Sequence, residues 1–243
     1  MLLSINADAK TVKGNSRGYL TGVLYLAPYN LSGRQVCPKA SEGCAAACLN
    51  TAGRGVYDNV QQSRIAKTNR FFENRKAFIA ELVRDIEALL RKAARERMIP
   101  VVRLNGTSDM PWEKFACVRN GVKYDSIIEA FPEINWYDYT KILNRHKALS
   151  LPNYNLTFSL SENNDKEAVK ALAQGYNVAV VMDVKRKEAK PTTWGGYPVI
   201  DGDETDLRFL DPKGGYIVAL FPKGKARKDE MGFVRPKDGG FNL

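Results

Sequence analysis

The feature that most constrains the fold is an alternation of short β-rich runs with helical segments. Seven apolar, β-branched or aromatic runs are predicted to be strands, at 19–28, 100–105, 134–138, 155–160, 177–184, 197–200 and 216–221. Helices are predicted between several of them, at 59–97, 112–131, 141–149 and 165–174. Parallel strands need crossover connections of this kind, so the pattern favours an α/β fold built on a parallel sheet.

The number of strand–helix units predicts how the sheet is organised. Seven or eight units within 243 residues, without an internal repeat or a linker, indicate one domain over residues 1–243. We expect a compact or degenerate (β/α) TIM-type barrel with a basic C-terminal tail from about residue 222. An open doubly wound sheet is the alternative, although the chain has no G-x-G-x-x-G or Walker A motif for a nucleotide.

Polar clusters follow several of the predicted strands. They include Asn105, Ser108 and Asp109, then Asp138 and Lys141, and later Asp201 and Asp203. In a (β/α) barrel the carboxyl ends of the strands meet at one mouth, so these side chains are predicted to share a site. One Asp could attack a carbon there while a second moves a proton. For any single residue, turn formation or helix capping is the competing interpretation.

Three of the four cysteines form a local cluster. Cys37, Cys44 and Cys48 lie on a glycine-containing loop after the first long strand, with the spacing C-x6-C-x3-C. A zinc ribbon would show paired C-x2-C units. The three sulfurs are predicted to converge, either on zinc with a fourth ligand from elsewhere or on three irons of a [4Fe–4S] cluster. Packing as small buried residues is the remaining interpretation.

The charge balance predicts a polyanionic partner. Lys and Arg number 37 against 27 acids, which gives a net charge of +10. DNA is the simplest such partner, and we expect contacts from a basic face of the 75–95 helix and from 221–228. The alternative is that these charges are only solvated. No apolar run of about 18 residues and no signal peptide is evident, which predicts a cytoplasmic protein without a membrane partner.

Five segments together resemble a phage protein family, the gene product 88 family. They are CPKASEGCAAACLNTAGRG, RLNGTSDMPWE, YDYTK, LTFSLSEN and VIDGDETDLRFLDPKGGYIVALFPKGKARKD, at 37–55, 103–113, 137–141, 156–163 and 199–229. The resemblance spans most of the chain. The family name by itself implies no chemistry.

Ser108–Asp109 and the segment WYDYTK at 136–141 are similar to motifs of the tRNA-guanine transglycosylase superfamily, which includes the DNA-acting DpdA proteins. This resemblance implies a phage DNA-modifying enzyme that replaces guanine with a 7-deazaguanine-type base. Asp138 would attack the sugar C1′, and Asp109 would handle the proton. Substrate contacts are predicted for Asn105, Ser108, Lys141, Asp201 and Asp203.

The cysteine loop resembles a different group, the radical SAM enzymes, which hold an iron–sulfur cluster on the loop after the first barrel strand. Their usual spacing is C-x3-C-x2-C rather than the C-x6-C-x3-C found here. This resemblance implies an iron–sulfur enzyme that uses Cys37, Cys44 and Cys48. A third possibility is a non-catalytic phage DNA-binding protein with structural cysteines.

Overall fold

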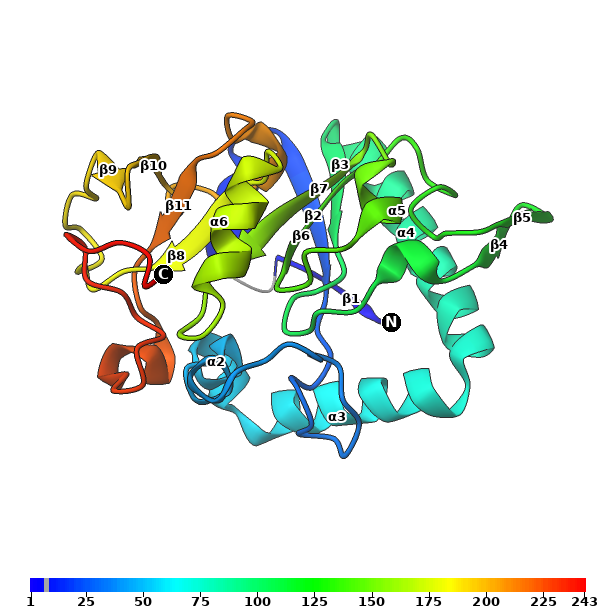
Figure 1. Ribbon diagram of the computed structural model, residues 1–243. Helices are drawn as coiled ribbons and strands as arrows, with labels where there is room; N and C mark the ends of the chain where they lie inside the picture. The colour runs from blue at the N-terminus through cyan, green and yellow to red at the C-terminus, as the bar shows by residue number, and fades with distance from the viewer. Residues whose placement is uncertain (7–8) are drawn as a thin grey trace.

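A nine-stranded, mostly parallel sheet organises the chain in the computed structural model, which describes residues 1–6 and 9–243 (Figure 1). In spatial order the strands are β1 (Leu3–Ile5), β2 (Tyr19–Leu24), β3 (Ile99–Arg103), β6 (Asn135–Thr140), β7 (Tyr154–Ser159), β8 (Val178–Val181), β11 (Ile217–Leu220), β10 (Tyr197–Asp201) and β9 (Thr193–Trp194). Neighbours from β2 to β10 pair in parallel, whereas β1 and β9 pair antiparallel at the two edges.

The seven predicted strands are all present, but the expected closed TIM-type barrel is not formed. From β2 to β8 the spatial order follows the chain order, and a doubly wound sheet would instead reverse direction near its middle. The short edge strands β1 and β9 each pair on one side only, with β2 and with β10. The sheet therefore ends at these two strands and stays open.

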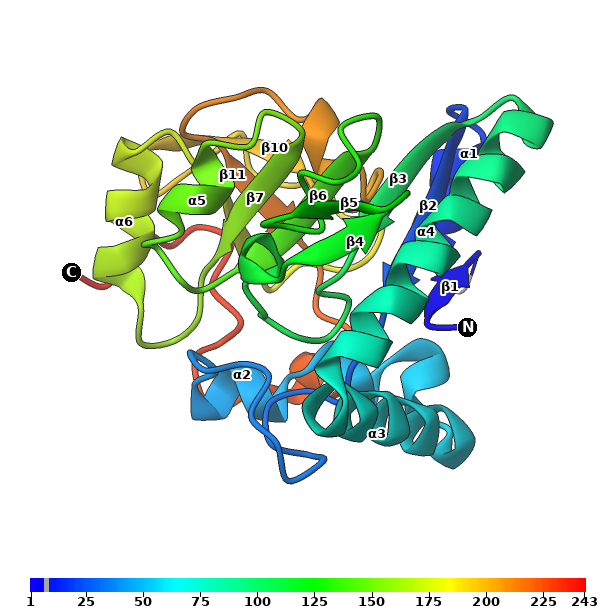
Figure 2. The same cartoon turned by 90° about the vertical axis from the view of Figure 1, so that its right-hand side faces the viewer.

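The predicted helix at 59–97 is two helices, α3 (Asp58–Glu73) and α4 (Arg75–Glu96). The break falls at Asn74, which has an extended φ of −143° and whose side chain accepts a hydrogen bond of 3.1 Å from the Ala77 N–H. Asn74 thus caps α4. The apolar stripe of α4 packs beside β2 and β3 (Figure 2). No helix in the described ranges is long and apolar enough to cross a membrane.

Two other helix predictions were wrong. Segment 112–131 contains a short 3₁₀ turn, η3 (Trp112–Lys114), and a hairpin of β4 (Cys117–Arg119) and β5 (Val122–Tyr124). Asn120 and Gly121, at the turn, both have positive φ, as a type I′ hairpin requires. In 141–149 only α5 (His146–Leu149) is helical, whereas α6 (Asp165–Ala173) confirms the fourth prediction.

Six short helical elements complete the described chain. They are α1 (Ala9–Asn15), α2 (Glu42–Ala46), η1 (Leu49–Thr51), η2 (Gly53–Val56), η4 (Arg208–Leu210) and η5 (Gly224–Lys228). Figure 1 shows α2 beyond the ends of the strands, near the start of α3.

The two faces of the sheet bury different residues. Trp136 of β6 belongs to the core beneath α4, whereas its neighbour Tyr137 packs with Val101 and Leu207 on the other face. Successive side chains of a strand point to opposite faces. Asp138 is therefore on the same side as Trp136 and α4, and Tyr139 is on the side of Tyr137. The alternation thus puts Asp138 and Tyr139 on opposite faces of the sheet.

Candidate functional site

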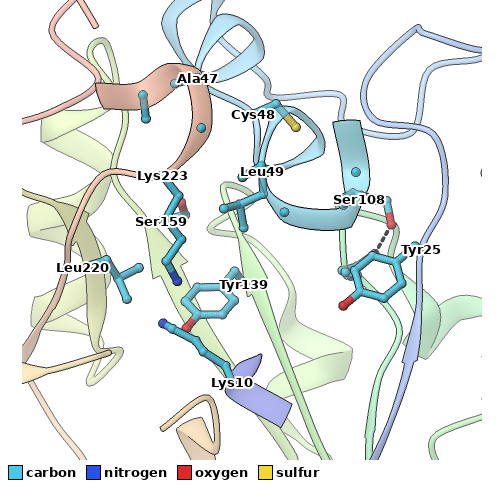
Figure 3. Close-up of a pocket in the computed structure, with 18 of the residues that line it drawn as sticks. Lys10, Tyr25, Ala47, Cys48, Leu49, Ser108, Tyr139, Ser159, Leu220 and Lys223 are labelled. Carbon is cyan, nitrogen blue, oxygen red and sulfur yellow. Dashed lines mark hydrogen bonds between the residues drawn. The ribbon is translucent and has the colours of Figure 1, made fainter. Parts of the chain in front are cut away.

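A cavity of about 970 Å³ opens at the carboxyl ends of the parallel strands. Strand ends supply Arg103, Tyr139 and Ser159 to its wall, and the cysteine loop and α3 cover it from another side. Figure 3 shows Tyr139 beneath the loop that carries Cys48. The position agrees with the general rule that parallel α/β sheets bind ligands at the carboxyl ends of their strands.

Most of the predicted site residues line this cavity. They are Cys37, Cys44, Cys48, Asn105, Ser108, Asp109, Lys141 and Asp203. Asp138 and Asp201 are not part of the lining. The structure thus brings together the three cysteines and the polar groups that follow β3, β6 and β10, but it separates the predicted nucleophile from them.

Asp138 lies behind the cavity, with a residue exposure of 1%. One carboxylate oxygen accepts a 2.7 Å hydrogen bond from the Asn105 N–H, and the other accepts a 2.9 Å bond from the Tyr154 hydroxyl. Burial raises the pKa of Asp138 to about 7, against the opposing effect of the nearby positive charge of Arg103. Asp138 therefore ties β6 to the end of β3 and to β7, which differs from the exposed position a nucleophile needs.

Asp109 is the predicted catalytic acid that does line the cavity. Its Oδ2 accepts a 2.8 Å hydrogen bond from the Lys141 N–H, and its Oδ1 lies 3.7 Å from Arg145 Nη1. Burial raises the pKa of Asp109, although hydrogen bonds from Lys141 and Thr140 work in the opposite direction. Oδ1 has no hydrogen-bond partner within the described residues.

Asn105 and Ser108 hold the loop after β3 in shape. The Asn105 Oδ1 accepts hydrogen bonds from the Ser108 hydroxyl, the Met110 N–H and the Trp112 indole N–H, at 2.9, 2.9 and 3.0 Å. Figure 3 shows the Ser108 hydroxyl engaged in this way. Since three donors occupy this oxygen, Asn105 positions Asp109 rather than offering its own carbonyl to a substrate.

The cysteine loop is fixed by Glu162, which follows β7. Its carboxylate accepts hydrogen bonds from the Ser41 hydroxyl at 2.8 Å and from the Gly43 N–H at 2.7 Å. Ser41 also caps α2 by accepting from the Cys44 N–H. A Cβ on Gly43 would lie 2.8 Å from the Glu162 carboxyl carbon, so a larger residue here would displace the end of this side chain from its hydrogen bonds. Glu162 thereby sets the position of Cys44 relative to the sheet.

The three sulfurs are electrostatic neighbours. Burial raises the pKa of Cys37 to about 12, and negative charges at Cys48, Asp109 and Cys44 raise it further. The pKa of Cys48 is raised by burial and by Cys44, and it is lowered by the cations Arg64 and Lys141. These thiols would lose their protons readily only beside added positive charge, such as a metal centre.

Backbone groups are aimed at two of the sulfurs. Cys37 Sγ accepts from the Tyr29 N–H at 3.3 Å, and Cys48 Sγ accepts from the Asn50 N–H at 3.5 Å. Hydrogen bonds of this type stabilise thiolates and tune clusters. Across residues 1–6 and 9–243, no group of three or more His, Cys, Asp or Glu side chains is arranged to hold a metal ion directly.

The wall of the cavity is strongly basic. Three carboxylates among the described lining residues, those of Asp109, Asp203 and Asp206, face a much larger set of cations. The cations are Lys10, Lys13, Arg54, Arg64, Lys67, Arg103, Lys141, Arg186, Lys223 and Arg227. Most of them were not predicted from the sequence. Arg103 had a usable signal, because it directly precedes the polar end of a predicted strand, whereas Lys10 and Arg64 had none.

The C-terminal basic segment, expected to be a tail, packs against the cysteine loop. The Lys225 N–H donates a 3.2 Å hydrogen bond to the Thr51 hydroxyl. Lys223 and Arg227 line the cavity, whereas the side chains of Lys225 and Lys228 do not and both residues are exposed. Half of this predicted DNA-binding segment therefore belongs to the internal site.

Comparison with known proteins identifies the family. No curated protein and no solved structure shows significant similarity to the chain. A family profile described as Gene product 88 matches residues 1–237 of the 243. The match covers the cysteine loop, all nine strands of the described sheet and the segment around Lys223. The chain therefore belongs to the gene product 88 family.

Proposed function

We propose that the protein is an iron–sulfur enzyme whose Cys37, Cys44 and Cys48 hold three irons of a [4Fe–4S] cluster. The observation that carries this proposal is that all three cysteines line one cavity at the carboxyl ends of the parallel strands. The fourth iron is left open to a ligand in that cavity. Bound there, the cluster would supply one-electron chemistry.

The cysteine count favours a cluster over a structural zinc ion. Structural zinc takes four ligands at about 2–2.3 Å. Cys117 and His146, the remaining cysteine and histidine, do not line the cavity. A cluster with one open iron needs three thiolates only. The location on the loop after the first parallel strand is also that of the radical SAM enzymes, which is support by analogy.

The chain's own residues have distinct parts in this proposal. Arg64 and Lys141 place positive charge near Cys48 and favour its thiolate. Arg64 is held by a hydrogen bond to the Asn50 side chain and lies over the Tyr25 ring, 4.8 Å from its centroid. Asp109 contributes its carboxylate to the cavity wall, with Oδ1 buried 3.7 Å from Arg145 Nη1.

Base exchange on DNA receives less support from this geometry. It needs a carboxylate that can reach the sugar carbon. Asp138, the predicted nucleophile, lies outside the cavity lining with both oxygens hydrogen-bonded. A 7-deazaguanine-type base and its exchange therefore have no further part in the proposal.

The test is anaerobic purification or reconstitution with iron and sulfide. We expect absorbance near 400 nm and about four irons per chain, as a cubane cluster requires. Cys37→Ser and Cys48→Ser should lose both signals. Cys117→Ser is the matched control and should keep them, since Cys117 lies in the β4–β5 hairpin. Stoichiometric zinc without iron in wild-type protein would contradict the proposal.

A further inference from the structure

One part of the cavity wall gathers lysines from distant parts of the chain. Lys10 comes from α1, and Lys223 follows β11. Figure 3 shows both side chains extending toward Tyr139, with Cys48 on a different side of the cavity. Lys13, one helical turn from Lys10, bonds the Asp203 backbone oxygen at 2.9 Å.

Asp203 is the carboxylate that lies closest to these lysines among the described residues. Asp203 Oδ1 lies 3.1 Å from Lys10 Nζ and 3.6 Å from Lys223 Nζ, while Oδ2 lies 3.5 Å from Lys190 Nζ. The neighbouring Asp206 lies against Arg103 at 2.9 Å and the Tyr137 hydroxyl at 2.8 Å, and its charge also acts on Lys10 and Lys223. Lys10, Lys13 and Lys223 lie near Asp203, and Arg103 pairs with Asp206, so among the described lining residues here the cations outnumber the carboxylates.

Burial and the neighbouring positive charge disfavour the charged form of Lys223. Burial and the adjacent Lys10 ammonium lower the pKa of Lys223 to about 8, although Asp203 and Asp206 partly oppose this. Like charges held together in a partly buried site disfavour the charged state unless a counterion is present. A dianion placed between Lys10 and Lys223 would remove this penalty.

We propose that Lys10, Lys13 and Lys223 form a subsite for the phosphate group of a small phosphorylated substrate. Lysine binds phosphate as a compact point charge. The cavity volume of about 970 Å³ lies at the upper end of the range for small-molecule sites, which is about 300–1,000 Å³, so it suits a molecule of mononucleotide size. This subsite rests on the proposed function in one respect: with its phosphate at the lysines, the substrate would have its other end facing the cysteines.

Binding to full-length protein tests the subsite. Inorganic phosphate, adenosine 5′-monophosphate and adenosine would be titrated at low salt. We expect the phosphate compounds to bind and compete, with adenosine at least tenfold weaker. Lys223→Met and Lys10→Met should each weaken the monophosphate about tenfold, the value of one charge-assisted contact. Lys228→Met, an exposed lysine five positions from Lys223, should change nothing.

Two further measurements distinguish an error in the proposed function from an error in the phosphate subsite. Cys37→Ser protein should still bind the monophosphate. Wild-type protein that binds the monophosphate but assembles no cluster would overturn only the proposed function. A cluster in protein that shows no phosphate binding would overturn only the subsite. Equal weakening by Lys228→Met and Lys223→Met, with thermal unfolding unchanged, would indicate unspecific charge attraction and also overturn it.

A 5′-phosphorylated oligonucleotide distinguishes the source of the phosphate. Tighter binding than the monophosphate, abolished in Lys223→Met, would support the subsite and assign it to a nucleic acid end. Oligonucleotide binding that Lys223→Met leaves unchanged, with no binding of the monophosphate, would overturn the subsite.

Discussion

The two sides of the cavity are unbalanced in opposite directions. On one side the thiols of Cys37 and Cys48 have raised pKa values, chiefly through burial, so they need a cation to become thiolates. On the other side Lys10 and Lys223 lie near the carboxylate of Asp203, which Lys190 also approaches. The two proposals together therefore give this site two ligands of opposite charge.

Replacing Asp203 should produce the largest loss of stability on the lysine side of the cavity. Asp203→Asn leaves three ammonium groups without their shared carboxylate, and breaking a buried ion pair costs about 3–5 kcal/mol of unfolding free energy. Added phosphate should restore more stability to this variant than to wild type. Thermal unfolding with and without phosphate measures both effects.

Asp201→Asn is the control for that variant. The Asp201 side chain is 50% exposed, against 9% for Asp203, and its nearest ion-pair contact, with Lys190, is 3.9 Å. We expect a change within about 0.5 kcal/mol. Equal destabilisation by the two variants would mean that the lysines are not unbalanced in the way described.

On the cysteine side, the next largest effect on stability is expected from a substitution at Gly43, which lies close to Glu162. Gly43→Ala places a Cβ 2.8 Å from the Glu162 carboxyl carbon, so the carboxylate must move away from its hydrogen bonds, and the loss of one such bond to a charged group costs about 1.5–3 kcal/mol. It should also lower the iron content after reconstitution, because Cys44 follows directly. Gly14→Ala is the control, since its Cβ would meet only Leu207 at ordinary contact distances of 3.6–3.8 Å.

The cysteine side of the cavity was predictable from the sequence and the lysine side was not, because only the cysteines are close together in the chain. The cysteines lie within twelve positions, so their spacing was visible at once. Lys10 and Lys223 are separated by most of the chain, and only the sheet order β2-β3-β6-β7-β8-β11-β10 brings them together. Lys223 had been assigned to a basic tail because nothing local indicates that the segment folds back.

The positions of the strands were predictable from the sequence, whereas the faces to which their side chains point were not. Apolar and β-branched runs located all seven predicted strands, but the alternation within β6 was ambiguous because Trp136, Tyr137 and Tyr139 are all aromatic. The strand predicted at 134–138 places Asp138 at its carboxyl end, whereas β6 continues to Thr140, so Asp138 lies within the strand. The helix predicted at 112–131 overlooked Asn120–Gly121, a hairpin turn signal that was present in the sequence.

The pH dependence of phosphate binding should show a moderate effect. The Lys223 pKa is lowered to about 8 by burial and by Lys10, with Asp203 and Asp206 opposing. Below pH 8 the ammonium is charged and binds the anion; above it the charge is lost, so affinity should fall several-fold between pH 7 and pH 9. In Lys223→Met the affinity should be weaker throughout and lack this decline.

The smallest expected effect is on the salt dependence of DNA binding, and it tests whether the cations inside the cavity act separately from those outside it. Arg84, Arg91 and Arg95 are exposed on α4, where the sequence predicts binding to DNA. For duplex DNA, the slope of log affinity against log salt becomes shallower by about 0.9 for each phosphate that the protein no longer neutralises. Changing all three arginines to Gln should therefore reduce that slope while leaving monophosphate binding unchanged. Lys223→Met should do the reverse, because its ammonium faces the cavity. If the triple variant instead binds the monophosphate more weakly, or both variants leave the DNA slope unchanged, the outer cations do not act separately from the inner ones in binding DNA.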